Sequence, residues 1–282
     1  MPRRLDGVYV HATGDPGLPA IVFIHGGGPS GPMWHAHMEA LAGRFHCLAP
    51  DLPGFGRSNQ LAPISLLATA DLIAELVDTR LAAHRAHVVG LSYGGSVVLA
   101  LLARHPEVLD RVVIDGASVL RERMDPLVVA LAILASPFVG TEIATAALGM
   151  IGMRSLGMAL RSATPGAFRR AWREGYTAPV WAATLRAPCP TLLVAGEREG
   201  ARASNAALAT LLPHATARFV PHLGHAWFLW RSELHIRMVE AWLSGEALPD
   251  GLLPEPPSPA AVERVRRRIQ GHPAPGARAT PA

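Results

Sequence analysis

The sequence predicts an α/β protein in which helices cover both faces of a mostly parallel sheet. Short apolar runs of strand length alternate with segments whose apolar residues recur at helical spacing. Half of the 282 residues are apolar and only 17% are charged, so the chain can bury a sizeable core. Sheets of this kind place their sites at the carboxyl ends of the strands. Functional side chains are therefore expected just after each strand.

The expected elements follow one another in a regular order. The first run, AIVFI, lacks polar residues and suits a strand that is buried on both faces. Residues 65–81 then repeat apolar side chains at helical spacing, and HVVGL returns to a strand. The expected strands are 20–24, 45–49, 87–91, 111–114, 190–195 and 217–220. The expected helices are 65–81, 93–104, 203–212 and 226–242.

This alternation divides the chain into a core, a cap and a tail. The α/β core is expected over 1–117 and 187–245. Residues 118–186 are rich in alanine, leucine, glycine and methionine, and are expected to form a helical cap over the carboxyl edge of the sheet. The proline- and alanine-rich tail, 246–282, contains one predicted short helix over 259–270, and the remainder is expected to be mobile.

The charge pattern argues against a nucleic-acid-binding protein. The net charge is +4, and all 26 basic residues are arginines. They are scattered except for Arg264, Arg266, Arg267 and Arg268, a run that adjoins Glu263 and has no interleaved aromatic residues. We interpret this run as a solvated helix face, and no nucleic-acid partner is expected.

A cytoplasmic protein without stable membrane insertion is predicted. The first residues contain no apolar run of the signal-peptide type. The longest uncharged apolar stretch, 126–141, contains a proline and is too short to span a bilayer. Cys47 and Cys189 are too few for a disulfide framework and are expected to be buried thiols, as in a reducing compartment. The oligomeric state is left open.

The motif Gly90-Leu91-Ser92-Tyr93-Gly94 lies between a predicted strand and a predicted helix. In G-x-S-x-G, a serine on a tight turn is held in a strained backbone conformation with its hydroxyl at a helix amino terminus. A glycine-rich turn with a capping serine is the alternative. The position directly after a strand favours Ser92 as a nucleophile.

A glycine run, His25-Gly26-Gly27-Gly28, follows the first predicted strand. Without side chains in the way, backbone N–H groups of such a loop can face a bound oxygen. The amide of Gly27 is one predicted oxyanion donor, and the amide of Tyr93 is the other. A flexible turn is the alternative for the glycine run taken alone.

Five motifs, in order along the chain, resemble those of the α/β-hydrolase family. They are HGGG at 25–28, PDLPGFGRS at 50–58, GLSYGG at 90–95, PTLLVAGE at 190–197 and PHLGH at 221–225, and the similarity covers most of residues 6–244. The resemblance implies an α/β-hydrolase fold with a mostly parallel eight-stranded sheet and a helical cap inserted after strand 6. It also implies the serine hydrolase branch, with an HGGGP oxyanion loop and a triad in the order Ser–acid–His.

The resemblance places the general base at His225, just after the last predicted strand. A serine hydroxyl becomes a good nucleophile when such an imidazole accepts its proton. His222 is near enough in sequence to be an alternative. His25 is expected to order its own loop, and His35 and His37 form an H-x-H pair without further ligands, so no metal site is expected.

The triad acid has three candidates. The family carries it shortly after the strand at 190–195, where Glu199 occupies the position of the usual aspartate. Asp115 competes because some relatives carry the acid after the preceding strand, although it could instead cap a turn there. Glu197 is the third candidate. A glutamate is one methylene longer than aspartate but can still orient the imidazole.

The resemblance implies acyl transfer to water through an acyl-serine, with no metal or organic cofactor. An epoxide hydrolase or haloalkane dehalogenase would have an aspartate at position 92. C–C bond hydrolases and proline iminopeptidases share HGGGP and remain alternatives, although GLSYG differs from the iminopeptidase GGSWG, and His35-Ala36-His37 lacks the asparagine of C–C hydrolases. A non-catalytic ligand-binding relative is the alternative from a different class.

The expected substrate is a carboxylic ester or lactone of small to medium size with an apolar acyl or alcohol part, because the cap is rich in leucine and adaptable methionine. Packing of the cap on the core is the alternative reason for these residues. The candidate substrate-binding residues are Gly26, Gly28, Trp34, Phe138, Met150 and Trp227.

Overall fold

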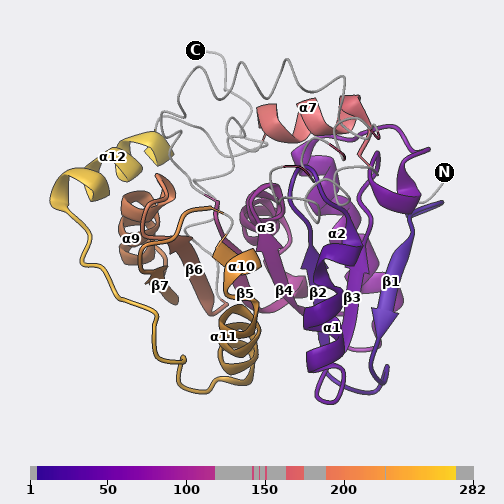
Figure 1. Ribbon diagram of the computed structural model, residues 1–282, viewed down its shortest axis with the longest axis horizontal. Helices are drawn as coiled ribbons and strands as arrows, with labels where there is room; N and C mark the ends of the chain where they lie inside the picture. Colours follow the sequence, from indigo (N-terminus) through magenta and orange to yellow (C-terminus); the bar gives the residue numbers. More distant parts are fainter. Residues whose placement is uncertain are drawn as a thin grey trace, which may run out of the picture.

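A twisted sheet of seven strands forms the centre of the described part of the molecule (Figure 1). The computed structural model describes residues 5–117, 163–174, 189–225 and 227–270, and the single residues 142, 146 and 150. The strand order is β1-β3-β2-β4-β5-β6-β7, with β1 antiparallel to β3 and the other pairs parallel. The strands are β1 (Val10–Thr13), β2 (Ala20–Ile24), β3 (His46–Pro50), β4 (Ala86–Leu91), β5 (Leu109–Asp115), β6 (Thr191–Gly196) and β7 (Ala215–Val220).

The sheet corrects two expectations about its size and its insertion. The described residues contain seven strands where eight were expected, because residues 5–7 form a turn and the first described strand begins only at Val10. Among the described strands, the region expected to form the cap lies between the fifth, β5, and the sixth, β6, whereas the expectation placed it after a sixth strand. The sequence pattern does not predict β1, since this short edge strand is only half-buried and lacks a continuous apolar run.

Helices cover both faces of the sheet, and the alternation within β2 shows how. Val22 and Ile24 belong to the core beneath α2, α3 and α9, whereas Ile21 and Phe23 belong to the core beneath α1 and α11. The α-helices are α1 (His35–Leu41), α2 (Leu66–Arg80), α3 (Tyr93–Arg104), α7 (Pro165–Glu174), α9 (Ala201–Leu211), α10 (Trp227–Trp230), α11 (Ser232–Ser244) and α12 (Pro259–Gln270). The short 3-10 helices are Gly31–Trp34, Gly56–Ser58 and Pro106–Val108.

None of the described helices is both long and apolar enough to cross a membrane. In the region expected to form the cap, α7 is the described helix, and it lies beyond one edge of the sheet (Figure 1). Of the apolar residues predicted for the cap, Met150 is described, whereas Phe138 lies outside the described residues.

The segment after α11 runs back along the core. Leu253 exchanges backbone hydrogen bonds with β7 at 2.8 and 2.9 Å, and Glu255 pairs with Arg202 of α9. Helix α12 lies beside α9 in Figure 1, and its Ala261 and Val265 are fully buried in the core there. The expectation of a mobile tail around its helix is therefore wrong for Leu253 and Glu255, because specific contacts hold them. Residues 271–282 lie outside the described residues.

Candidate active site

Ser92 occupies the sharp turn between β4 and α3. Its φ of 55° and ψ of −115° lie in a region that non-glycine residues rarely adopt. Backbone hydrogen bonds hold the turn on both sides: Ser92 N–H donates to the Asp115 carbonyl at 2.7 Å, and Ser96 N–H donates to the Ser92 carbonyl at 3.0 Å. The backbone conformation is the one that the G-x-S-x-G motif predicts.

Close packing of β2 against this turn explains the glycine at position 94. A Cβ atom on Gly94 would lie 2.2 Å from the carbonyl oxygen of Ile24, at the end of β2. Any side chain there would push α3 away from the sheet and carry Ser92 with it. The glycine is therefore a packing requirement of the turn.

The glycine run after β2 lies against the same turn. A Cβ atom on Gly26 would lie 3.6 Å from Cβ of Ser92, and one on Gly27 would lie 3.5 Å from Cβ of Tyr93. The fold thus brings together two segments that are far apart in the sequence. The two residues predicted to donate to an oxyanion, Gly27 and Tyr93, are neighbours in space.

His25 orders the glycine run, as the sequence predicts. Its Nδ1 donates to the carbonyl of Gly26 at 2.8 Å, and its Nε2 accepts from the N–H of Leu52 at 3.0 Å. Burial lowers the pKa of His25 to about 4, so the ring is neutral and can donate at one nitrogen while accepting at the other. This side chain therefore ties the glycine run to the loop after β3.

His225, after β7, faces Glu199, after β6. Nδ1 of His225 lies 2.5 Å from Oε1 of Glu199. The second carboxylate oxygen, Oε2, accepts from the N–H of Gly196 at 3.0 Å. One oxygen of Glu199 is thus held by the backbone while the other orients the imidazole. With Nδ1 engaged, Nε2 of His225 is the nitrogen that can accept a proton.

The electrostatic surroundings of His225 favour its protonated form. Burial lowers the pKa of His225, but the hydrogen bond to Glu199 and the charges of Glu199 and Asp115 outweigh burial and raise it above the ordinary value of 6.5. The side chain is nevertheless 48% exposed, so it is open on one side. A general base needs this combination, because it must be reachable and its protonated form must be stabilised.

Asp115, the competing acid, is directed to other partners. Its Oδ1 accepts from the indole N–H of Trp227 at 3.0 Å, and its Oδ2 lies 3.3 Å from Nε2 of His235. The side chain is fully buried. The geometry therefore favours Glu199 over Asp115 as the partner of His225.

Glu197 and His222, the remaining candidates, pair with each other. Oε2 of Glu197 accepts from the backbone N–H of His222 at 2.7 Å and lies 3.4 Å from its Nδ1. The His222 ring is 83% exposed. In the described part of the chain, this pair stabilises the loop before His225 and does not join the His225–Glu199 contact.

Gly116 contributes to the site although sequence analysis does not single it out. Its φ is +62°, and a Cβ atom there would lie 2.7 Å from Cε1 of His225 and 3.1 Å from Oε1 of Glu199. Only glycine leaves room for this pair. The Asp-Gly sequence at a strand end is a recognisable turn signal, but its importance depends on contacts with segments more than 80 residues away.

The two tryptophans predicted to bind substrate lie in the core. Trp34 and Trp227 are fully buried among apolar residues on the face covered by α1 and α11. The only polar atom of the Trp227 side chain is used by Asp115. Their burial corrects the expectation that they line a substrate site: size and position in sequence cannot distinguish a core aromatic from a pocket aromatic.

The other predicted substrate-binding residues differ in their surroundings. Gly26 and Gly28 are buried within the glycine run. Met150 is 83% exposed, and Phe138 lies outside the described residues. Of this set, Gly26 is placed directly beside Ser92.

Helix α7 closes over the glycine run. A Cβ atom on Gly27 would lie 2.9 Å from Cβ of Ala171, in the middle of α7. Glu174 anchors the end of the helix, because its Oε2 accepts from the N–H of Leu66 at 2.7 Å and its Oε1 accepts from Arg170 at 3.1 Å. The insertion therefore touches the predicted oxyanion loop directly.

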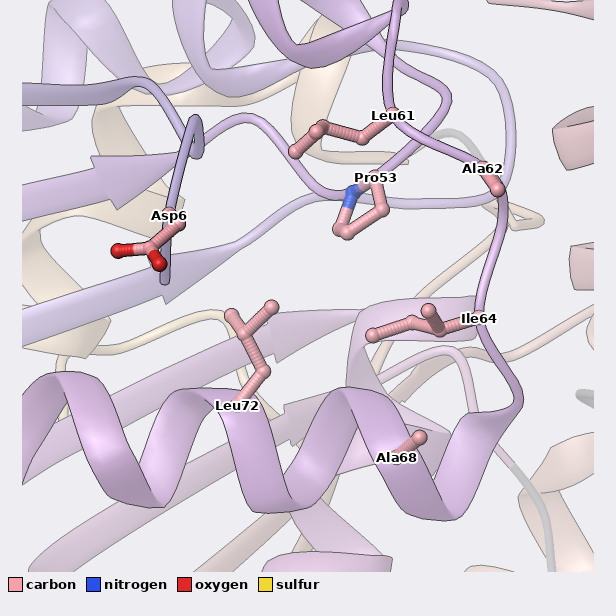
Figure 2. A pocket seen from close by; sticks show the side chains of 7 residues that line it. All are labelled: Asp6, Pro53, Leu61, Ala62, Ile64, Ala68 and Leu72. Carbon is pink, nitrogen blue, oxygen red and sulfur yellow. The ribbon is translucent and has the colours of Figure 1, made fainter. Parts of the chain in front are cut away.

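A cavity of about 320 Å³ lies between the loops after β3 and helix α2 (Figure 2). Figure 2 shows apolar side chains on opposite sides of it, with Leu61 and Pro53 facing Leu72 and Ile64. The lining residues are Asp6, Pro53, Leu61, Ala62, Ile64, Ala68 and Leu72. None of the predicted site residues lines this cavity, so it does not belong to the arrangement around Ser92.

The described residues contain no group of three or more histidine, cysteine, aspartate or glutamate side chains placed to hold a metal ion. Nucleophilic sulfur is also unavailable to the site. Cys47 and Cys189 are buried, and burial raises the pKa of both thiols, that of Cys47 to about 12.

Comparisons with known proteins agree with this architecture. The sequence model of the family described as alpha/beta hydrolase fold matches residues 19–142. An AB hydrolase superfamily protein from Gibberella zeae is 26% identical over 250 residues, which cover 84% of each chain.

Among solved structures, a thermophilic esterase from Thermogutta terrifontis is 23% identical with a TM-score of 0.69, covering 84% of this chain and 93% of the esterase. An enol-lactonase from Burkholderia xenovorans LB400 is 22% identical with a TM-score of 0.69, covering 84% of this chain and 96% of the lactonase. The partial sequence match and the shared architecture together show that the chain has the α/β-hydrolase fold.

Proposed function

We propose that this chain is a serine hydrolase that cleaves a carboxylic ester or lactone carrying an apolar group. The observation that carries the proposal is the hydrogen bond between His225 and Glu199, at the sheet edge where Ser92 holds its strained turn. Ser92 is then the nucleophile, His225 the general base and Glu199 the acid that orients it. The solved neighbours named as an esterase and an enol-lactonase support this class of reaction.

The first half of the reaction forms an acyl-serine. Nε2 of His225 takes the hydroxyl proton of Ser92 while Oγ attacks the carbonyl carbon of the substrate. The amides of Gly27 and Tyr93, two residues that are neighbours in space, then stabilise the resulting oxyanion by donating to it. The protonated imidazole then gives its proton to the departing alkoxide, which leaves as an alcohol. In a lactone, this alcohol remains attached to the acyl group.

The second half returns the enzyme to its starting state. His225 removes a proton from water, which attacks the acyl-serine carbonyl, and the same oxyanion donors stabilise the second tetrahedral intermediate. Collapse of this intermediate releases the carboxylic acid, and the imidazolium returns its proton to Oγ of Ser92. The net reaction consumes one water and needs no electron donor or acceptor.

Covalent labelling tests the proposal before any substrate is known. A small fluorophosphonate reacts with an activated serine and adds a fixed mass to the intact protein. We expect one adduct on the wild-type chain and none on Ser92→Ala. Ser96→Ala is the matched control because Ser96 lies one turn further along the same helix, and this variant should still be labelled.

Two outcomes would contradict the proposal. An adduct that persists in Ser92→Ala would place the reactive group elsewhere. Folded wild-type protein that gives no adduct would favour a non-catalytic ligand-binding protein of the same fold. After a positive result, p-nitrophenyl esters and aliphatic lactones of increasing acyl length would test the preference for an apolar group.

A further inference from the structure

A buried chain of polar side chains adjoins the site and takes no direct part in the proposed reaction. Nε2 of His37 in α1 lies 2.7 Å from Nδ1 of His235 in α11. Nε2 of His235 lies 3.3 Å from Oδ2 of Asp115, whose Oδ1 accepts from the indole N–H of Trp227 at 3.0 Å. All four side chains are buried. They connect two helices on one face of the sheet to the strand end beside the nucleophile turn.

The two histidines of this chain are neutral. Burial lowers the pKa of His37 to about 2, with a smaller contribution from His235, and burial lowers the pKa of His235 to about 3. Their contact needs one donor and one acceptor. A proton on Nε2 of His235, facing Asp115, leaves its Nδ1 to accept from Nε2–H of His37. Neither ring supplies a positive charge to balance the carboxylate.

Asp115 is therefore a buried carboxylate that lacks a full set of partners. Within the described residues, its Oδ2 makes no well-aligned hydrogen bond. Burial raises the pKa of Asp115 to about 7, while the Trp227 hydrogen bond and the charge of His225 lower it. The charged form of Asp115 thus depends on a nearby imidazolium, and the natural source of that charge is His225.

We propose that Asp115 is a positioning residue for the general base, acting both as an anchor and as a second negative charge. The anchor is the hydrogen bond to Trp227, which lies two residues after His225. The negative charge of Asp115 adds to that of Glu199 and stabilises the His225 imidazolium in the step in which His225 holds a proton. This inference rests on the proposed function, because it assigns His225 as the base.

The groups around the pair define what a pH experiment would report. Among the described residues, the titratable side chains facing Asp115 and His225 are Glu199 after β6, His235 in α11 and, behind it, His37 in α1. Because His37 and His235 are neutral, Glu199 and Asp115 are the negatively charged side chains in this set that act on His225. Removing the charge of Asp115 should therefore leave Glu199 as the only negative charge that stabilises the His225 imidazolium among these groups.

Asp115→Asn separates the charge from the anchor. The amide oxygen of asparagine can still accept from Trp227, and its NH₂ group can donate to Nε2 of His235 once the two neutral histidines exchange tautomers. The loop is therefore retained while the negative charge is lost. Loss of this charge destabilises the imidazolium, and His225 should release its proton at lower pH. We expect the rising limb of kcat/KM against pH to shift downward by on the order of half a pH unit or more.

Asp110→Asn is the matched control for this measurement. Asp110 lies near the start of β5, at the opposite end of the strand from Asp115, where it is half-exposed and paired with Arg85 at 2.7 Å. Its loss removes one charge from the same strand but should leave the rising limb in place. An unchanged limb in Asp115→Asn, or equal shifts in both variants, would overturn the role of the Asp115 charge.

Trp227→Phe provides a second, independent variant if Asp115→Asn folds poorly. Phenylalanine keeps an aromatic ring in the core but removes the N–H that stabilises ionised Asp115 and anchors the loop. We expect kcat to fall by about threefold or more and the rising limb to shift to lower pH. An unchanged kcat and pH profile in folded Trp227→Phe would overturn the proposal.

Labelling by the fluorophosphonate separates this inference from the proposed function. At pH 9, where His225 is neutral in both proteins, wild type and Asp115→Asn should both form the Ser92 adduct. An adduct together with an unshifted pH profile would reject the positioning role and leave the serine hydrolase intact. Absence of an adduct in wild type would reject the serine hydrolase itself, and with it the role of Asp115.

Discussion

At the scale of single residues, Glu199 stands where the α/β-hydrolase pattern usually has an aspartate. The longer side chain needs space beside His225 and a fixed second oxygen. Gly116 provides the space, since a Cβ atom there would lie 3.1 Å from Oε1, and the N–H of Gly196 holds Oε2 at 3.0 Å. The residues around Glu199 therefore accommodate the longer side chain of glutamate at this position.

Substitution of Glu199 tests this pairing. Glu199→Gln removes the charge and can present an amide NH₂ to Nδ1, which disfavours the productive tautomer of His225. We expect kcat to fall by roughly 10²–10⁴-fold with the fold preserved. Glu197→Gln, two positions away and paired with His222, is the control and should stay within about threefold of wild type. Equal losses in both variants would argue against Glu199 as the acid.

The raised pKa of His225 predicts the direction and position of the pH dependence. Only neutral imidazole can accept the Ser92 proton, so kcat/KM should rise with pH as His225 loses its proton. Since its pKa is raised by Glu199 and Asp115, the midpoint should lie above 6.5. A profile measured from pH 5 to 9 that is flat, or that falls across this limb, would rule out His225 as the base.

At the scale of elements, α7 packs against the glycine run, and the sequence of neither segment predicts this contact. Gly27 has no side chain in a position where Ala171 already fills the space. The insertion between β5 and β6 therefore affects the predicted oxyanion donor through direct packing. Its described helix acts as part of the wall of the site.

The packing of Gly27 against Ala171 can be tested by a substitution that creates a steric clash and a second substitution that removes it. Gly27→Ala would place a methyl group 2.9 Å from Cβ of Ala171, so the loop or α7 must move. Because oxyanion donors need accurate placement, we expect kcat/KM to fall between about 10- and 10³-fold. Adding Ala171→Gly should recover much of this loss in the double variant.

The control for that pair is Gly43→Ala. A Cβ atom on Gly43 would meet nothing within 4 Å, so the variant should keep wild-type kinetics. If Gly27→Ala were as active as wild type, or if Ala171→Gly gave no recovery, the proposed contact would have no effect on the site.

Element boundaries also show where periodicity is informative. The pattern predicts a helix over 93–104, and α3 spans Tyr93–Arg104. The expected helix over 226–242 is instead α10 and α11, because Arg231 has φ −133° and ψ 47° and interrupts the helical backbone. The short helix α1 escapes prediction because it is seven residues long and only three of them are buried. Long, buried segments are thus predicted better than short, half-exposed ones.

At the scale of the whole molecule, the carboxyl-terminal segment completes the core. Helix α12 packs against α9 with Ala261 and Val265 fully buried, while Arg264, Arg266 and Arg267 are exposed. Three of the four arginines thus form the predicted solvated face, whereas Arg268 is half-buried, and the buried face of the helix packs against α9. The helix is anchored at its start, where Ser258 Oγ accepts from the N–H of Ala261 at 3.1 Å.

Docking of α12 should contribute to global stability and not to catalysis. Val265→Ala removes buried methyl groups at its contact with the core, and we expect the free energy of unfolding in urea to fall by about 1–3 kcal/mol. Arg266→Ala, on the exposed face, should change it by less than about 0.5 kcal/mol. Equal stability of the two variants would show that the helix does not dock, and a large loss of kcat in Val265→Ala would contradict its separation from the site.

Apart from β1 and α1, the sequence alone determined the order of the core strands and helices, the turn carrying Ser92 and the loop role of His25, because each depends on residues close together in the chain. The resemblance to the α/β-hydrolase family placed the candidate base and its candidate acids on loops that follow neighbouring strands. Tertiary structure decided whether Glu199 or Asp115 faces His225, since both end a strand of the same sheet and only their side-chain partners differ. It also assigned Trp34 and Trp227 to the core. An aromatic side chain has the same local signature in a core as in a pocket, and only contacts between distant segments distinguish the two.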